Sequence, residues 1–362
     1  MLSKKTAVIL FNLGGPTASD EVRPFLFNLF NDKAIIGLPQ PFRFFLAKLI
    51  SSRREKKAQK IYSLIGGKSP LLDLTLIQAD SLEKELSFFG DFKVFIAMRY
   101  NKPFSEEVVE KVINYDPKEV ILLPLYPQFS TTTTESSFKD FTSKFLKKCK
   151  KNNKEIKMKF VCCYPNDADF IKAHSLLIKQ TLVQSNNIDF SKLRLLFSAH
   201  GLPQKVINAG DPYVFQVENT SQEVVRNLSR LFNTDEAKID FEVCYQSKVG
   251  PLEWTKPSLE FSLKKTILDK KIPVIVPISF VSEHSETLVE LDIEYKEMAH
   301  EMGALSYIRV PALNSDGNFI KSLTEICKTV DSDNVNSCFA GKQKDRICPK
   351  KSVRCPNFNF CE

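Results

Sequence analysis

The sequence of 362 residues has no long apolar run. No stretch approaches the roughly 20 consecutive apolar residues that a membrane-spanning helix needs. The first apolar stretch, "TAVILFNLGGP" (6–16), is short, runs into Gly-Gly-Pro and lacks a small-residue cleavage site, so it predicts a first strand rather than a signal peptide. We therefore expect a cytoplasmic protein.

Several common catalytic motifs are also missing. "NLGGP" is not the G-x-G-x-x-G of dinucleotide-binding proteins, and the chain has no P-loop pattern. "SAHG" is not the G-x-S-x-G of a serine hydrolase. Dinucleotide chemistry and serine hydrolysis therefore have little support.

The charge balance is basic, with 51 Lys and Arg against 43 Asp and Glu and a formal net charge of +8. Such a balance suits acidic ligands, anionic lipid headgroups or nucleic acid. The sequence has neither zinc-finger spacing nor a basic groove with interleaved aromatic residues. We therefore expect no nucleic-acid partner.

The nine cysteines are an odd number in a large chain without a secretion signal, which argues against a disulfide framework. Hydrophobic residues make up 43% of the chain, including 29 Phe. A chain of this length and composition is typical of a soluble protein with two cores.

Short apolar runs, each followed by turn residues and then a helical pattern, recur along the chain. Their alternation predicts α/β architecture with buried parallel strands. The strand-like runs are 7–16, 93–100, 119–127, 158–165, 193–203, 240–247, 273–280 and 304–313. The helix-sized segments between them include 71–88, 104–114, 166–184, 214–231 and 285–302.

The series is duplicated. "AVILFNLGGP" (7–16) is similar to "RLLFSAHGLP" (194–203), and "VILLPLYPQFSTTTTESSF" (120–138) is similar to "PVIVPISFVSEHSETLVEL" (273–291). The periods are unequal, so we predict duplicated architecture rather than a repeat array. The expected domains are 1–175 and 176–330, followed by a cysteine-containing tail, 331–362.

Polar and aromatic residues follow the predicted strands. In open parallel sheets the ligand site lies beyond the carboxyl ends of the strands. Two such domains facing each other would therefore form an interdomain cleft lined by these residues. They are Gly14, Gly15, Pro16, Arg99, Tyr100, Tyr126, His200, Tyr245 and His284.

The stretch "PISFVSEHSETLVELDIEY" (277–295) places a histidine among carboxylates directly after an apolar run. A His/Glu pair can hold a divalent metal and accept protons. On an α-helical wheel, however, the Glu residues form one stripe opposite an apolar face, as in an ordinary amphipathic helix. The stripe consists of Glu283, Glu286, Glu290, Glu294 and Glu297. The wheel alone leaves both interpretations open.

The segment "AIIGLPQPFRFFLAKLISSRR" (34–54) does not fit the alternation of strands and helices. It is apolar and aromatic with interspersed basic residues. Such a segment suits a lip that enters a membrane interface or covers an apolar ligand. A helix that packs between elements is the alternative.

Seven motifs together resemble the ferrochelatase family, which inserts ferrous iron into a porphyrin at the end of haem synthesis. They are "VILFNLGGP", "IYSLIGGKSPL", "AMRY", "LPLYPQFSTTTT", "FSAHGLP", "YQSKVGPLEW" and "PISFVSEHSETLVELDIEY". The similarity runs in order from about residue 5 to about residue 330. It implies two Rossmann-like, doubly wound parallel-sheet domains facing a porphyrin cleft, as in class II chelatases.

The resemblance also implies the site. His200 would face the centre of the macrocycle, with Glu286 opposite and with His284 and Glu290 close behind. We expect His200 to accept a proton and Glu286 to act in metal delivery or proton removal, both as ligands of the substrate Fe²⁺. The pocket wall would comprise Leu13, Arg54, Arg99, Tyr100, Tyr126 and Trp254.

The chemistry accounts for these residue types. Insertion removes two pyrrole protons and requires a distorted ring, which a rigid apolar cleft can hold. Arginines suit the propionates because guanidinium pairs bidentately with carboxylate. The lip at 34–54 implies peripheral attachment to the inner face of the cell membrane.

The tail has four cysteines, Cys338, Cys348, Cys355 and Cys361. Some family members carry a [2Fe–2S] cluster on four thiolates, one of them a mid-chain cysteine where this sequence has Thr131. A cluster on the four tail cysteines, a zinc site and unliganded thiols all remain open.

Three alternative hypotheses compete with insertion of Fe²⁺ into protoporphyrin IX. One is insertion of Fe²⁺ into coproporphyrin III, and the second is insertion of another divalent metal. The third is a carrier of haem or metal with this fold and no turnover. The apolar lip favours the less polar protoporphyrin.

Overall fold

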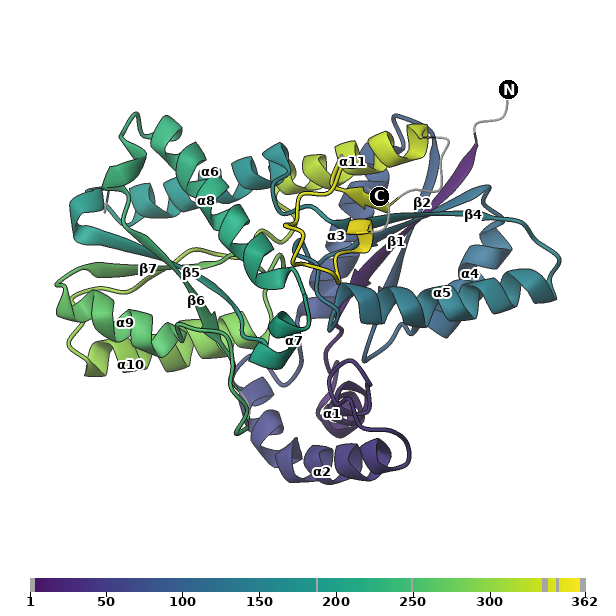
Figure 1. Cartoon of the computed structure of the whole chain (residues 1–362), viewed down its shortest axis with the longest axis horizontal. Coiled ribbons are helices and arrows are strands. Elements are labelled where there is room, and N and C mark those ends of the chain that lie inside the picture. Colours follow the sequence, from purple (N-terminus) through teal and green to yellow (C-terminus); the bar gives the residue numbers. More distant parts are fainter. Residues whose placement is uncertain (1–3, 187, 249, 334–337, 343–344, 359–362) are drawn as a thin grey trace. The chain divides into compact units, whose positions relative to one another are not determined.

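The computed structural model describes residues 4–186, 188–248, 250–333, 338–342 and 345–358. The chain forms two compact units (Figure 1). The first comprises Met1–Cys163 and Leu323–Lys344, and the second comprises Tyr164–Ser322 and Asp345–Glu362.

The first unit contains a five-stranded sheet in which every pairing is parallel, in the order β2-β1-β3-β4-β9. Its strands are β1 (Lys5–Asn12), β2 (Asp91–Met98), β3 (Glu119–Pro124), β4 (Lys157–Cys163) and β9 (Cys338–Ala340). Its helices are α1 (Val22–Phe30), α2 (Phe42–Ser63), α3 (Leu71–Leu86), α4 (Ser105–Tyr115) and α5 (Thr134–Lys151).

Strand β1 shows why both faces of this sheet are covered. Ala7, Ile9 and Phe11 point to one face and pack with α4 and α5 in one core cluster. Val8 and Leu10 point to the opposite face and are also fully buried. A strand buried on both faces reads as a continuous apolar run, as "AVILF" does.

The second unit contains a four-stranded parallel sheet in the order β6-β5-β7-β8. Its strands are β5 (Leu193–His200), β6 (Phe241–Gln246), β7 (Ile272–Pro277) and β8 (Ile308–Arg309). Its helices are α6 (Ala168–Gln184), α7 (Gln204–Asn208), α8 (Tyr213–Leu231), α9 (Leu259–Leu268), the π-helix η4 (Glu286–Glu294) and α10 (Tyr295–Glu301).

The two sheets repeat one strand order. In each unit the first strand in the sequence lies between the second and the third, and the fourth follows the third. This equates β1 with β5 and β3 with β7, which are the pairs that the sequence similarity predicts. The predicted α/β class with duplicated, doubly wound parallel sheets is confirmed.

The units differ from the expected domain limits in two places. The expected boundary after residue 175 falls inside α6, all of which belongs to the second unit. Helix α11 (Gly317–Ser332) begins in the second unit and returns the chain to the first. A buried lysine, Lys159, fixes its end there by donating to the carbonyl oxygens of Val330 (3.0 Å) and Asp331 (3.1 Å) while pairing with Glu119 (2.6 Å).

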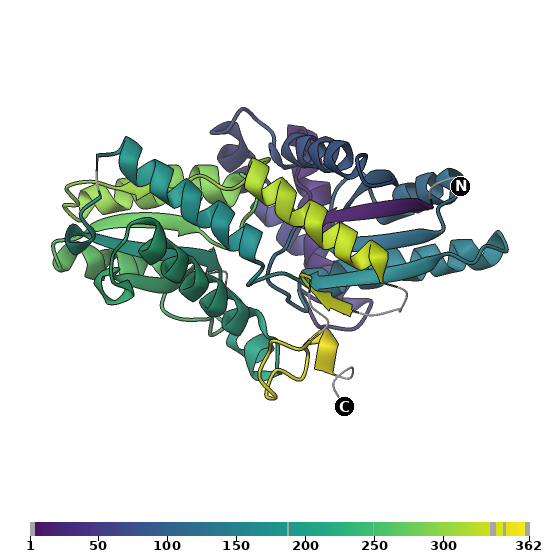
Figure 2. The ribbon, with the colours of Figure 1, turned by 90° about the horizontal axis from the view of Figure 1, so that it is seen from above.

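The expected tail is likewise divided. Strand β9 adds to the edge of the first sheet, whereas residues 345–358 belong to the second unit. The Arg354 amide donates to the Gly210 carbonyl at 3.1 Å, which holds this segment against the turn after α7 (Figure 2). Gly210 has φ +92°, and a Cβ there would lie 2.5 Å from Val353 Cγ2.

The segment 34–54 divides into a loop and the first half of α2. Several of its large apolar side chains are exposed, at 67% for Phe42 and 65% for Phe45. None of the helices described is both long and apolar enough to cross a bilayer.

Candidate active site

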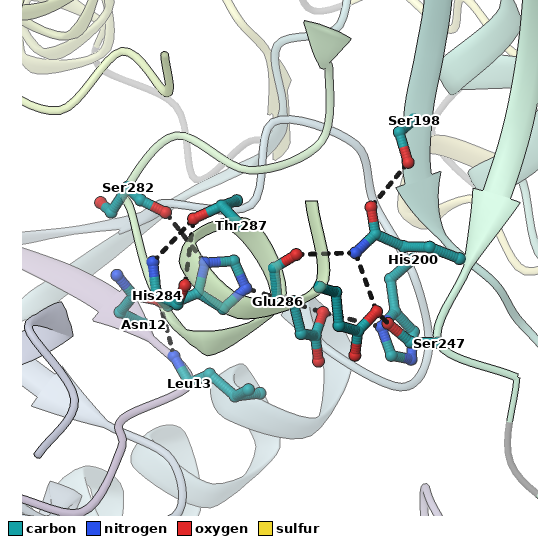
Figure 3. A network of polar contacts seen from close by, with 11 residues as sticks. Asn12, Leu13, Ser198, His200, Ser247, Ser282, His284, Glu286 and Thr287 are labelled. Atoms are coloured by element: carbon teal, nitrogen blue, oxygen red, sulfur yellow. Dashed lines mark hydrogen bonds and ion pairs between the residues drawn. The ribbon is translucent and has the colours of Figure 1, made fainter. Parts of the chain in front are cut away.

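Strand β5 and the helix η4 bring the two central residues together. His200 is the last residue of β5, and Glu286 is the first residue of η4, which follows β7. Because β5 and β7 are parallel neighbours, their carboxyl ends lie at one edge of the sheet. The structure therefore brings His200 and Glu286 together (Figure 3).

The pair is in direct contact. His200 Nδ1 lies 2.9 Å from Glu286 Oε2, and His284 Nε2 lies 3.6 Å from the same oxygen. His284 Nδ1 is 3.0 Å from the Ser282 carbonyl oxygen, which can only accept, so Nδ1 carries the proton of a neutral His284. The His200 side chain is 36% exposed and is therefore open to a substrate.

The protonation equilibria of the site are coupled. Burial would raise the pKa of Glu286, but the two histidines hold it well below the ordinary value. Burial would lower the pKa of His200 and of His284, but the Glu286 carboxylate raises both. An ionised carboxylate accepts only, so His200 donates from Nδ1 and leaves Nε2 as the free basic nitrogen.

Glu290 lies one turn further along η4 and has a different environment. Burial, and then the charge of Glu286, raise its pKa to about 7. Its Oε2 accepts from Ser247 Oγ at 2.6 Å and from Gln246 Nε2 at 3.1 Å. The site therefore holds one carboxylate that stays ionised and one that titrates near neutral pH.

Sequence reasoning missed the residues that orient this network. Gln246 Nε2 also donates to the Glu286 carbonyl oxygen at 2.9 Å, and Ser198 Oγ donates to Gln246 Oε1 at 2.6 Å. Gln246 is the last residue of β6 and Ser247 follows it. Their position at a strand's carboxyl end was the signal that could have identified them.

Trp254, one of the residues predicted to line the pocket, lies beside His200. Their ring centroids are 6.5 Å apart. A Cβ on Gly201 would lie 3.1 Å from the Gln246 carbonyl oxygen and 3.3 Å from Trp254 Cε3, so the turn after His200 requires a residue without a side chain. The Gly in "SAHGLP" therefore lets the Trp254 ring pack closely against the turn that follows His200.

In the first unit, Arg99 and Tyr100 share a partner that the sequence did not indicate. Arg99 Nη2 lies 2.8 Å from Asp32 Oδ2, and Tyr100 OH donates to the same oxygen at 2.9 Å. Arg99 Nε donates to Ser136 Oγ at 2.8 Å, and Ser136 in turn donates to Asp32. Tyr100 is buried, so its hydrogen bond to Asp32 has a structural role.

The other predicted wall residues of this unit, Leu13, Arg54 and Tyr126, have different surroundings. Leu13 packs against the core cluster that contains Tyr100. The Arg54 guanidinium lies over the ring of Phe30, 5.6 Å from its centroid. Tyr126 instead packs partly buried against the core formed by α4 and α5.

The acidic stripe does not have α-helical geometry. Residues 286–294 form a π-helix, so the wheel of 3.6 residues per turn was the wrong template for them. Glu294 and Glu297 are exposed, so this end of the acidic stripe is an ordinary solvated face.

In the described part of the chain, no group of three or more His, Cys, Asp or Glu side chains is arranged to hold a metal ion. Cys338 is buried in β9 with its thiol beside that of Cys162. Cys348 and Cys355 lie in the second unit with adjacent thiols, and Cys361 lies outside the described residues. A cluster on the four tail cysteines, a zinc site and unliganded thiols therefore stay open predictions.

Comparison with known proteins agrees with the motifs and the fold. The family model "Ferrochelatase" matches residues 5–330. A ferrochelatase of Rickettsia bellii is 52% identical over 97% of this chain and 95% of its own length. One of Pelagibacter ubique is 45% identical over 98% of this chain and 99% of its own.

Among solved structures, SirB from Bacillus subtilis with Fe³⁺ covers 91% of this chain and 96% of its own, with a TM-score of 0.51 and 11% identity. At that identity the likeness concerns the fold alone. The family model covers residues 5–330, and the two relatives cover nearly the whole chain. The chain belongs to the ferrochelatase family.

Proposed function

We propose that the protein inserts Fe²⁺ into protoporphyrin IX and that His200 and Glu286 form the reaction centre. Membership of the ferrochelatase family makes it an enzyme of haem biosynthesis that inserts iron into a porphyrin. The observation that supports this site is the contact between His200 and Glu286 at the carboxyl edge of the second sheet.

Insertion releases two protons, and the site offers acceptors for them. Neutral His200 has Nε2 free to accept a pyrrole proton, and Glu286 stabilises the imidazolium that results. Glu290, with a pKa of about 7, can take up a proton at neutral pH and release it to solvent. We assign His200 to proton acceptance, Glu290 to proton transfer, and Glu286 and His284 to orientation of His200.

The substrate Fe²⁺ meets imidazole and carboxylate ligands in this cluster. Such ligands bind Fe²⁺ but release it more readily than thiolates would. We propose that His200 and Glu286 contact iron as it passes to the ring. Iron is consumed in the reaction, so a site of passing contact needs fewer fixed ligands than a resident metal site.

For the porphyrin, we propose that the wall residues predicted from sequence surround the ring. Trp254 supplies an apolar face beside His200. Arg54 is the better candidate for a propionate, because the donors of Arg99 already engage Asp32 and Ser136. The predicted cleft between the two domains stays a prediction.

We also propose that the apolar end of α2 binds a membrane surface. Exposed Phe42, Phe44, Phe45 and Leu49 lie on a helix that carries seven basic residues and one acidic residue. Exposed aromatic and aliphatic groups with adjacent cations suit an anionic lipid interface. Protoporphyrin is poorly soluble, so such contact would help the enzyme to capture it.

The tail cysteines do not support a [2Fe–2S] cluster on the described residues, and we derive no step through one. Cys338 is buried in β9 and so is not presented as an exposed ligand. We expect anaerobically purified protein to lack the visible absorbance bands of such a cluster. Those bands, lost in Cys348→Ser, would establish it.

The substrate assignment is tested by anaerobic insertion of Fe²⁺ into protoporphyrin and into coproporphyrin. We expect the larger kcat/KM with protoporphyrin, which lacks the two additional propionates of coproporphyrin. A larger kcat/KM with coproporphyrin would assign that substrate instead. No insertion into either ring would refute the proposed function.

A further inference from the structure

Arg309, on the edge strand β8, pairs with two carboxylates of the segment that carries the site. Its side chain is 13% exposed. Its Nε donates to Asp292 Oδ1 at 2.7 Å, Nη2 donates to Asp292 Oδ2, and Nη1 donates to Glu283 Oε1. It therefore forms a bidentate pair with one carboxylate and a single bond with another.

The two carboxylate partners of Arg309 lie on either side of the reactive residues in the sequence. Glu283 directly precedes His284, and Asp292 lies two residues after Glu290. One guanidinium thus ties together both ends of the stretch that carries His284, Glu286 and Glu290. The Glu283 oxygen that Arg309 contacts, Oε1, also accepts the Ala312 amide at 2.9 Å.

The helix that Arg309 holds is of an uncommon type. A π-helix is rare, and helices of this type occur frequently at functional sites. A second contact from the same strand edge supports it: Tyr307 OH donates to the Leu291 carbonyl oxygen at 2.7 Å. Tyr307 and Arg309 are two residues apart, and both contact the final part of η4.

We infer that Arg309 is a positioning residue for iron insertion, which sets the place of Glu286 and Glu290 by holding Glu283, just before η4, and Asp292, within it. The inference rests on the proposed function. Arg309 itself contacts neither His200 nor Glu286 in any described bond, so it acts through the helix. Lysine cannot replace it fully, because an ammonium cannot make the bidentate contact.

A matched control exists in the same unit. Arg194, on β5, pairs with Asp240 at 2.9 Å and with Asp269 at 2.8 Å, and it is also buried. It lies near the start of β5, whereas His200 is the last residue of that strand. Arg194→Met therefore removes an equivalent two-carboxylate network without touching η4.

The test compares Arg309→Met, Arg309→Lys, Tyr307→Phe and Arg194→Met by anaerobic insertion kinetics and thermal unfolding. We expect Arg309→Met to lower kcat about 10- to 100-fold while KM for the porphyrin changes less than about 3-fold. The kcat of Arg309→Lys should lie between that of Arg309→Met and that of wild type. Arg194→Met should lower Tm comparably and keep kcat.

Equal kcat losses in Arg309→Met and Arg194→Met would overturn the inference, since both would then reflect stability alone. So would a wild-type kcat in Arg309→Met. If Arg309→Met does not fold, Arg309→Lys and Tyr307→Phe carry the test, and a wild-type kcat in both would overturn it. Inactive wild-type protein would instead refute the proposed function.

Discussion

His200 Nδ1 and Glu286 Oε2 lie 2.9 Å apart, which joins the end of strand β5 to the start of the π-helix η4. The contact does two things at once. It fixes the orientation of the imidazole, and it raises the pKa of His200 against the opposing effect of burial. The base strength of the site is therefore set by a carboxylate that itself stays ionised.

The first prediction concerns the pH dependence of kcat. His200 accepts a proton only when neutral, so kcat rises with pH through its raised pKa. Glu286→Gln removes the charge that raises the pKa of His200 and of Glu290. The acid limb should therefore move to lower pH, while the maximal kcat falls. A pH–rate profile of both proteins measures this.

Glu294→Gln is the control for this experiment, because Glu294 belongs to the same helix but is exposed. Its profile should match that of wild type. An acid limb of Glu286→Gln that stays in place or moves to higher pH would contradict the assignment of His200 as the base.

The second prediction concerns the stability cost of Glu290. Burial and Glu286 raise the pKa of Glu290 from 4.5 to about 7. A carboxyl with a raised folded pKa costs nothing below the unfolded pKa and reaches its full cost above the folded one. Glu290→Gln should therefore stabilise the protein at pH 8, by up to about 3 kcal/mol, and have little effect at pH 4.5.

Chemical denaturation at the two pH values checks this prediction. Gln keeps an oxygen that can accept from Gln246 and Ser247, so the two hydrogen bonds are preserved. The same variant should insert iron more slowly, since it cannot transfer a proton. Equal stability changes at pH 4.5 and pH 8 would show that the charge of Glu290 does not destabilise the folded protein.

The third prediction concerns Asp32. Its buried carboxylate pairs with Arg99 and accepts from Tyr100 and Ser136. Asp32→Asn leaves Arg99 without its counter-charge and should destabilise the protein by about 3 kcal/mol. Asp140→Asn is the control, because Asp140 lies 3.8 Å from Arg99 and is more exposed. Similar losses in both variants would contradict a special role for Asp32.

The fourth prediction concerns the exposed end of α2. Phe42→Ser with Phe45→Ser should reduce sedimentation with vesicles that contain anionic lipid, because apolar contact with the interface is lost. Phe88→Ser is the control, since Phe88 is 74% exposed and lies outside this segment. Unchanged sedimentation of the double variant, or an equal loss with Phe88→Ser, would refute the membrane surface.

Much of the fold could be predicted because each strand reads as a short apolar run between turn residues. Strand β9 was missed because it has only three residues, Cys338–Ala340, and forms by adding to an existing edge. The return of α11 to the first unit depends on Lys159, whose contacts lie more than 170 residues away in the chain. No local pattern encodes a contact of that range.

The candidate site likewise contains residues that could be predicted from the sequence and residues that could not. His200 and Glu286 could be predicted because both follow strands, and strand ends converge at one edge. The π-helix could not, since its residues "ETLVELDIE" also suit an α-helix. Asp32 and Arg309 were missed because an isolated charged residue gives no sign of its partners.

The most direct test of the central claim is anaerobic insertion of Fe²⁺ into protoporphyrin by wild type, His200→Ala and His300→Ala, with porphyrin binding followed by fluorescence. His300 is exposed on α10 and serves as the matched histidine. We predict that His200→Ala lowers kcat by about 10² or more while it keeps porphyrin binding, and that His300→Ala behaves as wild type. Retention of wild-type kcat in His200→Ala would contradict the account.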